Sequence, residues 1–207
     1  KRRSLLKAGA AFAVPGVLSF GASAKPVSKA KAPKVLVVYF SRPGMNYVSG
    51  DMVNLPVGNT EKFAKIIAKT LDAPLFRIEP VTPYPFDYRK TTAIAREERS
   101  AGKARDAKAI PDIRGYDVIF WGHPIWYGEM PYIVRGVLSK LDCAGKTIVP
   151  FVTHEGSGIG DTANLVRSFQ KRAAVREGLG ILGTRFARNE PVEPEITAWL
   201  KRLGYQK

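Results

Sequence analysis

Most of the chain alternates between short apolar runs and longer stretches with helical periodicity. Residues 34–41 (KVLVVYFS) form an unbroken apolar run rich in β-branched and aromatic residues, which is typical of a strand buried on both faces of a parallel sheet. Residues 60–71 instead place their apolar side chains on one stripe, which predicts an amphipathic helix. Further strands are predicted at residues 75–79, 117–122, 147–153 and 179–184, and further helices at residues 91–103, 131–141, 161–174 and 193–203. Strands that alternate with helices in this way predict an α/β fold with a doubly wound, five-stranded parallel sheet.

The first 24 residues have the order of an export signal. A basic start precedes an apolar run over residues 8–20, and the small residues ASA end the segment as a cleavage pattern. The run is shorter than the roughly 20 residues that span a membrane, so we expect no permanent anchor. Arg2 and Arg3, within RRSLLK, make the leader similar to a twin-arginine signal, which directs folded proteins across the bacterial inner membrane. An ordinary secretory signal with two chance arginines is the alternative.

We therefore expect three segments in the chain. A signal peptide occupies residues 1–24 and is cleaved after about Ala24, a basic tether occupies residues 25–33, and a periplasmic domain occupies residues 34–207. The net charge of +15 is concentrated at the start, because residues 1–34 hold eight basic and no acidic residues, which leaves +7 for the rest. A mildly basic globule without a basic-aromatic motif argues against nucleic acid as a partner, and it is compatible with an anionic redox partner.

Candidate chemistry lies in three loops that follow predicted strands, where doubly wound sheets bind their ligands. The first loop contributes Ser41, Arg42 and Asn46, and then Gly58, Asn59 and Thr60 at the start of a helix. Hydroxyls, amides and backbone N–H groups at a helix N-terminus suit an anion, although an ordinary capping turn is the alternative for residues 58–60.

The second loop, HPIWYGEMP at residues 123–131, contains an aromatic pair that can stack on a planar ring. Packing of Trp126 in the core is the alternative, and His123 is expected to be structural because it ends a buried strand. The third loop, THEGSGIG at residues 153–160, has glycines that let the backbone approach a ligand closely. A hydrolase is disfavoured, because Glu155 replaces the first glycine of a nucleophile elbow and no orienting partner follows His154.

Five ordered segments resemble the flavodoxin-like FMN-binding family: YFSRPGMNY, GNTEKFAKIIA, IEPVTPYP, GHPIWYGEMP and THEGSGIG. The resemblance covers about residues 34–184. It implies the strand order 2-1-3-4-5 and FMN as cofactor. It implies a phosphate site at Ser41, Arg42, Asn59 and Thr60, with Asn46 in the same loop; a flavin ring flanked by Pro124, Ile125, Trp126, Tyr127 and Gly128; and a further wall from Thr153, His154, Glu155, Gly156 and Gly158. No metal and no catalytic side chain are expected, because flavin carries the chemistry.

Two departures from the family pattern shape the functional expectation. Residues 42–58 separate Ser41 from Asn59, where ordinary flavodoxins have one compact phosphate loop, and the third loop lacks a second stacking aromatic. One flavin face is therefore expected to be open to substrate. We expect an FMN-binding oxidoreductase that transfers electrons to quinones or similar small acceptors in the periplasm. The alternatives are a non-enzymatic electron shuttle between protein partners and a binding protein without redox work.

Overall fold

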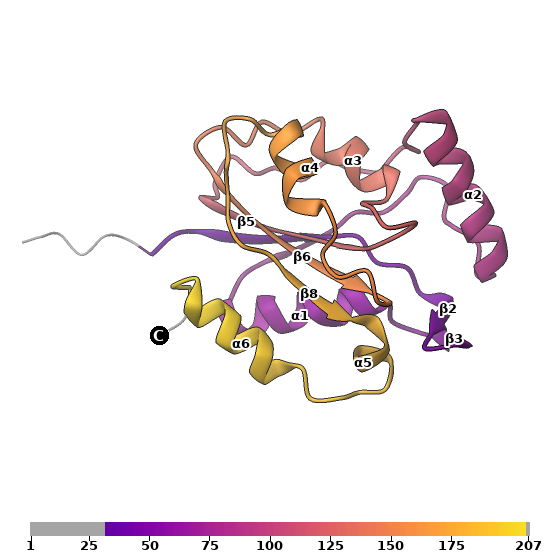
Figure 1. Cartoon of the computed structure of the whole chain (residues 1–207). Coiled ribbons are helices and arrows are strands. Elements are labelled where there is room, and N and C mark those ends of the chain that lie inside the picture. Colours follow the sequence, from indigo (N-terminus) through magenta and orange to yellow (C-terminus); the bar gives the residue numbers. More distant parts are fainter. Residues whose placement is uncertain (1–31, 206–207) are drawn as a thin grey trace, which may run out of the picture. The chain divides into compact units, whose positions relative to one another are not determined.

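A parallel β-sheet lies at the centre of residues 32–205, the part of the chain that the structure, a computed structural model, describes (Figure 1). The sheet contains β1 (Val35–Tyr39), β4 (Leu75–Arg77), β5 (Val118–Pro124), β6 (Thr147–His154), β7 (Ala174–Val175) and β8 (Leu179–Leu182). Its order is β4-β1-β5-β6-β7, β8 also pairs with β6, and all these pairs are parallel. Helices cover both faces, so the predicted doubly wound α/β class is confirmed.

Numbered along the chain within this sheet, the strands follow the predicted order 2-1-3-4-5, except that the last position holds two short strands. β7 pairs with the start of β6 and β8 pairs with its end. Pro150 lies between the two paired stretches, and it has no N–H to continue the ladder beyond the bond from Arg176 N to Ile148 O. A proline in β6 therefore explains why the sheet has six strands where five were predicted.

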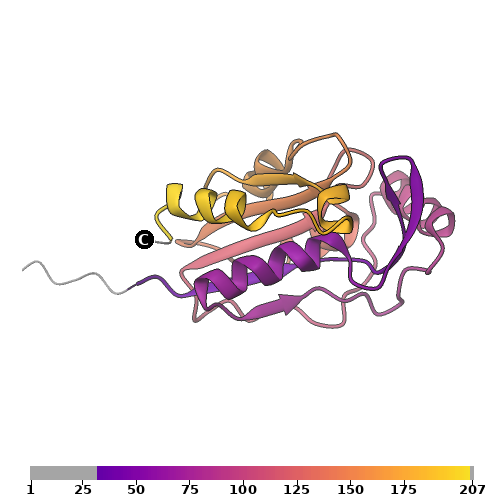
Figure 2. The same ribbon diagram turned by 90° about the horizontal axis from the view of Figure 1, so that it is seen from below.

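Two layers of helices bury the two faces of the sheet. α1 (Asn59–Leu71), α5 (Gly183–Ala187) and α6 (Glu193–Arg202) lie on one face, and α3 (Tyr132–Leu138) and α4 (Thr162–Phe169) lie on the other (Figures 1 and 2). Phe63, Phe151 and Trp199 belong to the core under α1 and α6. Trp121 and Ile133 belong to the core under α3 and α4. The alternation of side chains along each strand supplies both cores.

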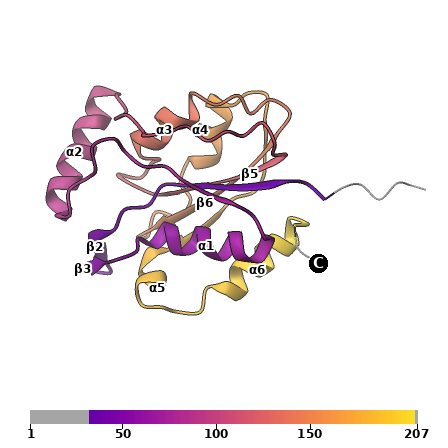
Figure 3. The same cartoon turned by 180° about the vertical axis from the view of Figure 1, so that it is seen from behind.

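An antiparallel hairpin replaces the loop that was predicted between Ser41 and Asn59. Its strands are β2 (Gly44–Val48) and β3 (Asp51–Leu55), and the turn between them has positive φ at both Ser49 and Gly50. The hairpin and α2 (Tyr88–Ala101) lie at the same end of the sheet, where β2 contacts α2 and α5 (Figure 3). The parallel strands have their carboxyl ends at this end of the sheet.

The predicted helix at residues 161–174 was too long, because α4 ends at Phe169. The next residue, Gln170, is buried, and its side-chain amide donates to the carbonyls of Leu138 and Leu141 and accepts from Cys143 N. These bonds hold the chain away from helical geometry before β7. The predicted signal peptide and residues 25–31 of the predicted tether lie outside the described residues. Within residues 32–205, no helix combines the length and apolarity needed to cross a membrane.

Candidate functional site

A cavity of about 150 Å³ lies where the carboxyl ends of β1, β5 and β6 meet the start of α1. We call it the central cavity. It brings together most of the residues predicted from the three loops: Ser41, Arg42, Asn46, Asn59, Thr60, Pro124, Ile125, Trp126, Thr153, His154 and Glu155. Tyr127 lines a neighbouring cavity instead, and Gly128, Gly156 and Gly158 line neither of the two. The strand ends therefore assemble the three loops into one site, as the sequence predicted.

The start of α1 lies directly against the segment that follows β1. Glu61 N donates to Gly58 O and also to Ser41 Oγ, each at 3.1 Å, so the segment after β1 is hydrogen-bonded directly to the first turn of the helix. Gly58, the N-cap, makes this approach possible: an added Cβ would collide with Ser41 Oγ and lie 2.7 Å from Arg42 O. Its φ of −67° is open to any residue, so Gly58 is required for space and not for conformation.

Two N–H groups at the start of α1 are free for a ligand. Among the described residues, Asn59 N and Thr60 N have no hydrogen-bond acceptor. Beside them, the buried hydroxyl of Thr60 lies 2.7 Å from the hydroxyl of Thr153 at the end of β6. Asn59 Oδ1 is buried and has no partner within the described chain. Free donors at a helix N-terminus suit a phosphate, and the orphaned amide oxygen suits a hydroxyl donor on the same molecule.

The lining of the central cavity also includes a carboxylate, that of Glu155. Glu155 accepts a hydrogen bond of 2.6 Å from Thr184 Oγ1. A Cβ on Gly183 would lie 2.7 Å from Glu155 Oε1 and 2.8 Å from Asn59 Nδ2, so these two side chains converge over Gly183. The sequence analysis missed Gly183, because it lay inside the strand predicted at residues 179–184, whereas β8 ends at Leu182 and leaves Gly183 directly after the strand. A carboxylate here suits ligand hydroxyl groups and not the phosphate itself.

Arg42 has a different role from the predicted phosphate contact. The residue is 8% exposed, and its guanidinium donates to the carbonyls of Pro43, Pro85 and Phe86 and to Met45 O. Burial lowers the pKa of the guanidinium, although an arginine stays charged at neutral pH. The side chain therefore ties the hairpin to the segment before α2, and it forms one wall of the central cavity.

The sequence left two roles open for Trp126, lining the site or packing in the core, and the structure combines them. Its ring lines the central cavity, and it also packs edge-on against Phe40 at 5.5 Å and Tyr84 at 5.0 Å between ring centroids. Trp126 and Glu129 exchange backbone hydrogen bonds around a turn with positive φ at Tyr127 and Gly128. This geometry is the tight hairpin turn in which glycine is preferred. The turn therefore depends on Gly128, and the rings of Phe40 and Tyr84 hold the indole of Trp126 in place.

A second cavity of about 350 Å³ adjoins the central one on the side of α2. We call it the α2 cavity. The two cavities share Arg42, Asn46, Tyr88, Ile125 and Trp126. Thr91, Thr92 and Ala95 of α2 complete it together with Tyr127, whose hydroxyl donates to Thr92 O at 2.8 Å.

Two tyrosines in this region were missed by the sequence analysis. Tyr47 from β2 and Tyr88 at the start of α2 both line the central cavity. Burial, followed by the nearby Tyr127 and Tyr47, raises the pKa of Tyr88. Tyr47 ends the segment YFSRPGMNY but was assigned no role there, and Tyr88 lies outside the quoted segments, because the hairpin and α2 reach the site through tertiary packing.

The third loop contributes the imidazole of His154 and a glycine-rich turn. His154 Nδ1 accepts a hydrogen bond of 3.1 Å from Gly156 N, which orients the imidazole at the end of β6. Burial lowers the pKa of His154. Gly156, Gly158 and Gly160 all have positive φ, so the loop needs its glycines for conformation. Their contribution to the site is to shape the wall rather than to line the cavity.

Comparisons with known proteins found a matching family and similar solved structures. A family model for Flavodoxin matches residues 34–203. A crystal structure of a candidate flavoprotein from Bacteroides eggerthii has 26% identity and a TM-score of 0.64, and the match covers 83% of this chain and 98% of that one. A similar candidate flavoprotein from Bacteroides uniformis has 24% identity and a TM-score of 0.61, covering 81% and 99%. A flavoprotein from Lactobacillus acidophilus, solved in complex with FMN, has 20% identity and a TM-score of 0.53, covering 72% and 93%. No curated protein matches the chain.

His123 lies behind the site and not in it, as its place in a buried strand predicted. It is fully buried, and Nδ1 donates to Pro124 O at 3.0 Å, which leaves Nε2 unprotonated and without a partner in the described chain. Burial lowers the pKa of this imidazole from 6.5 to about 4. The native protein therefore holds His123 neutral.

We expect this buried histidine to make stability depend on pH. The unfolded chain takes up a proton near pH 6.5 and the native chain does so only near pH 4, so the stability is full above about pH 6.5 and is lost as the pH falls toward 4. Between pH 6.5 and 5, this one group accounts for a loss of about 1.5 kcal/mol in the free energy of unfolding. Urea unfolding of wild type and His123→Gln at both pH values measures the difference. The same pH dependence in wild type and His123→Gln would show that His123 is protonated in the native state.

Proposed function

We propose that this chain, which belongs to the flavodoxin family, is an oxidoreductase that passes electrons from FMN to quinones or similar small acceptors in the periplasm. FMN is the cofactor of this flavodoxin, as the family and the FMN complex of the Lactobacillus acidophilus flavoprotein support. When bound, FMN supplies the electron transfer, and the protein supplies binding, orientation and electrostatics.

The residues of the central cavity fit FMN by their donors and acceptors. The free N–H groups of Asn59 and Thr60, with the hydroxyl of Thr60, would hold the phosphate. The unpartnered Asn59 Oδ1 and the carboxylate of Glu155 would accept hydrogen bonds from the ribityl hydroxyl groups. Trp126, braced by the core, would present one face of its indole system to the flavin ring.

The observation that carries the oxidoreductase proposal is the α2 cavity. Pockets for small organic ligands measure about 300–1,000 Å³, and the α2 cavity lies within that range. It shares Trp126 and Ile125 with the central cavity, so a small ring held there would lie next to the flavin site. A carrier that only exchanges electrons with other proteins has no need for such a cavity.

Reoxidation kinetics test this proposal. FMN-loaded protein is reduced with dithionite without oxygen and is then mixed with increasing menadione, a small quinone. We expect the reoxidation rate to saturate with menadione concentration, because the quinone first binds in the α2 cavity. Thr92→Phe fills that cavity from α2 and should raise the half-saturating concentration by about fivefold or more, while Ala93→Phe, on the exposed face of the same helix, is the control.

The outcome separates the enzyme from the shuttle. A rate that rises linearly with menadione and is equal in both variants would contradict a bound small acceptor and favour electron exchange between proteins. FMN content is measured in each variant, so a loss of cofactor is not mistaken for a loss of quinone binding.

The periplasmic part of the proposal rests on the leader, residues 1–24. Replacing Arg2 and Arg3 together with Lys should keep the precursor inside the cell, because the folded-protein route reads the twin arginines. Cell fractionation with immunoblotting measures this. Export of the double variant by a route that requires an unfolded chain would support the secretory alternative.

A further inference from the structure

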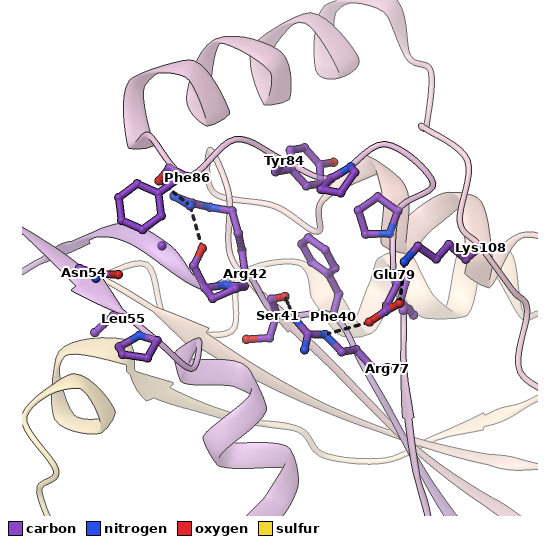
Figure 4. Close-up of a pocket in the computed structure, with 16 residues that line it drawn as sticks. Phe40, Ser41, Arg42, Asn54, Leu55, Arg77, Glu79, Tyr84, Phe86 and Lys108 are labelled. Carbon is purple, nitrogen blue, oxygen red and sulfur yellow. Dashed lines mark hydrogen bonds and ion pairs between the residues drawn. The ribbon is translucent and has the colours of Figure 1, made fainter.

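A third cavity, of about 580 Å³, shares only Ser41 and Arg42 with the lining of the central cavity (Figure 4). We call it the edge cavity, because β4 is the edge strand of the sheet. It is enclosed by the end of β4, the base of the hairpin at Gly44 and Leu55, and residues 80–86. Its volume is within the range of pockets that bind small organic molecules. Nothing in the proposed function uses it.

The walls of the edge cavity are apolar and rigid. Phe40, Tyr84 and Phe86 contribute rings, and four prolines line the remaining sides: Pro43, Pro56, Pro80 and Pro83. Tyr84 is fixed from behind, because its hydroxyl donates to Glu98 at 2.8 Å and Arg105 lies 4.0 Å from its ring centroid. Proline rings offer no N–H donor, so these walls suit a flat apolar body that makes few hydrogen bonds.

The mouth of the edge cavity carries an excess of positive charge. Arg42, Arg77 and Lys108 line it together with one carboxylate, Glu79. Glu79 is shared, since it lies 3.1 Å from Lys108 Nζ and 4.0 Å from Arg77 Nε (Figure 4). Arg77 has a second partner in Glu61 at 3.3 Å, but Glu61 also pairs with Lys65 at 2.6 Å, so three cations share two carboxylates.

Arg42 adds a further, buried positive charge to this lining. Within the described residues, no carboxylate lies within ion-pair distance of its guanidinium, whose partners are carbonyls. Arg77 and Lys108 line the edge cavity and neither of the other two, whereas Arg42 lines all three, so the charge of Arg77 and Lys108 is not part of the FMN site. An incoming anion would therefore meet positive charge that the carboxylates of the described residues do not neutralise.

We propose that the edge cavity binds a small aromatic acid, a flat apolar molecule that carries one carboxylate or sulfonate group. The rings and prolines receive the flat body, and the acid group lies at the mouth between Lys108 and Arg77. Phe86, which is 61% exposed, covers one side of the entrance. This site is independent of the proposed electron transfer.

Two probes that differ by one charge test the proposal. 8-Anilino-1-naphthalenesulfonate is the acid, and N-phenyl-1-naphthylamine is its neutral counterpart. Binding to FMN-saturated protein is measured by equilibrium dialysis, so that the central cavity is filled and flavin absorbance does not interfere. We expect Lys108→Gln to weaken binding of the sulfonate by about two- to fivefold and to leave the neutral probe unchanged. Lys140→Gln, an exposed lysine outside the cavity lining, is the matched control.

A second variant locates the site. Phe86→Ala should weaken both probes by about fivefold, because it removes a ring from the wall, while Phe169→Ala on α4 removes an aromatic side chain elsewhere and should change neither. If Phe86→Ala and Lys108→Gln both bind the probes as wild type does, the edge cavity is not the site. If Lys108→Gln weakens both probes equally, the ligand is not defined by its acid group.

Discussion

The contact between the Ser41–Arg42 segment and the start of α1 is the constraint on which the site depends. Gly58 leaves room for Ser41 and Arg42 to approach the helix, and Ser41 Oγ accepts a hydrogen bond from Glu61 N. Within the described residues, the N–H groups of Asn59 and Thr60 remain free. The same approach brings Thr60 to within 2.7 Å of Thr153 on β6. A side chain at residue 58 would move the helix away from β1, and the donors for a phosphate would no longer face the strand ends.

Arg42 extends this constraint to the rest of the functional end. A buried guanidinium is costly unless its donors are satisfied, and here the satisfied donors hold Met45 of the hairpin and Phe86 before α2. Arg42 itself lines all three cavities, and two of the residues that its guanidinium holds, Pro43 and Phe86, line the edge cavity. Electron transfer at the central cavity and ligand binding at the edge cavity are separate proposals that share this wall.

The sequence was most informative where burial dictates pattern. Fully apolar runs such as residues 34–41 identify parallel strands, and the loops after them identify the ligand end, so most of the central cavity was predicted. The hairpin was missed because its exposed residues, such as Met52, carry no alternation that separates strand from loop. Tyr47 and Tyr88 reach the site by packing over a distance in the sequence. Arg42 was predicted to contact phosphate because it is a positive charge next to an anion-binding loop. The sequence does not show that backbone carbonyls accept the hydrogen bonds of its guanidinium.

The most direct test of this account is Gly58→Ala, compared with Gly115→Ala. Both glycines have backbone conformations open to alanine, but only at Gly58 would the new Cβ meet neighbouring atoms. We expect Gly58→Ala to lower the free energy of unfolding by about 1–3 kcal/mol and to weaken FMN binding, measured by titration of flavin fluorescence, by about tenfold. Gly115→Ala should leave FMN affinity as in wild type. Wild-type stability and FMN affinity in Gly58→Ala would contradict the claim that the approach of α1 to Ser41 builds the site.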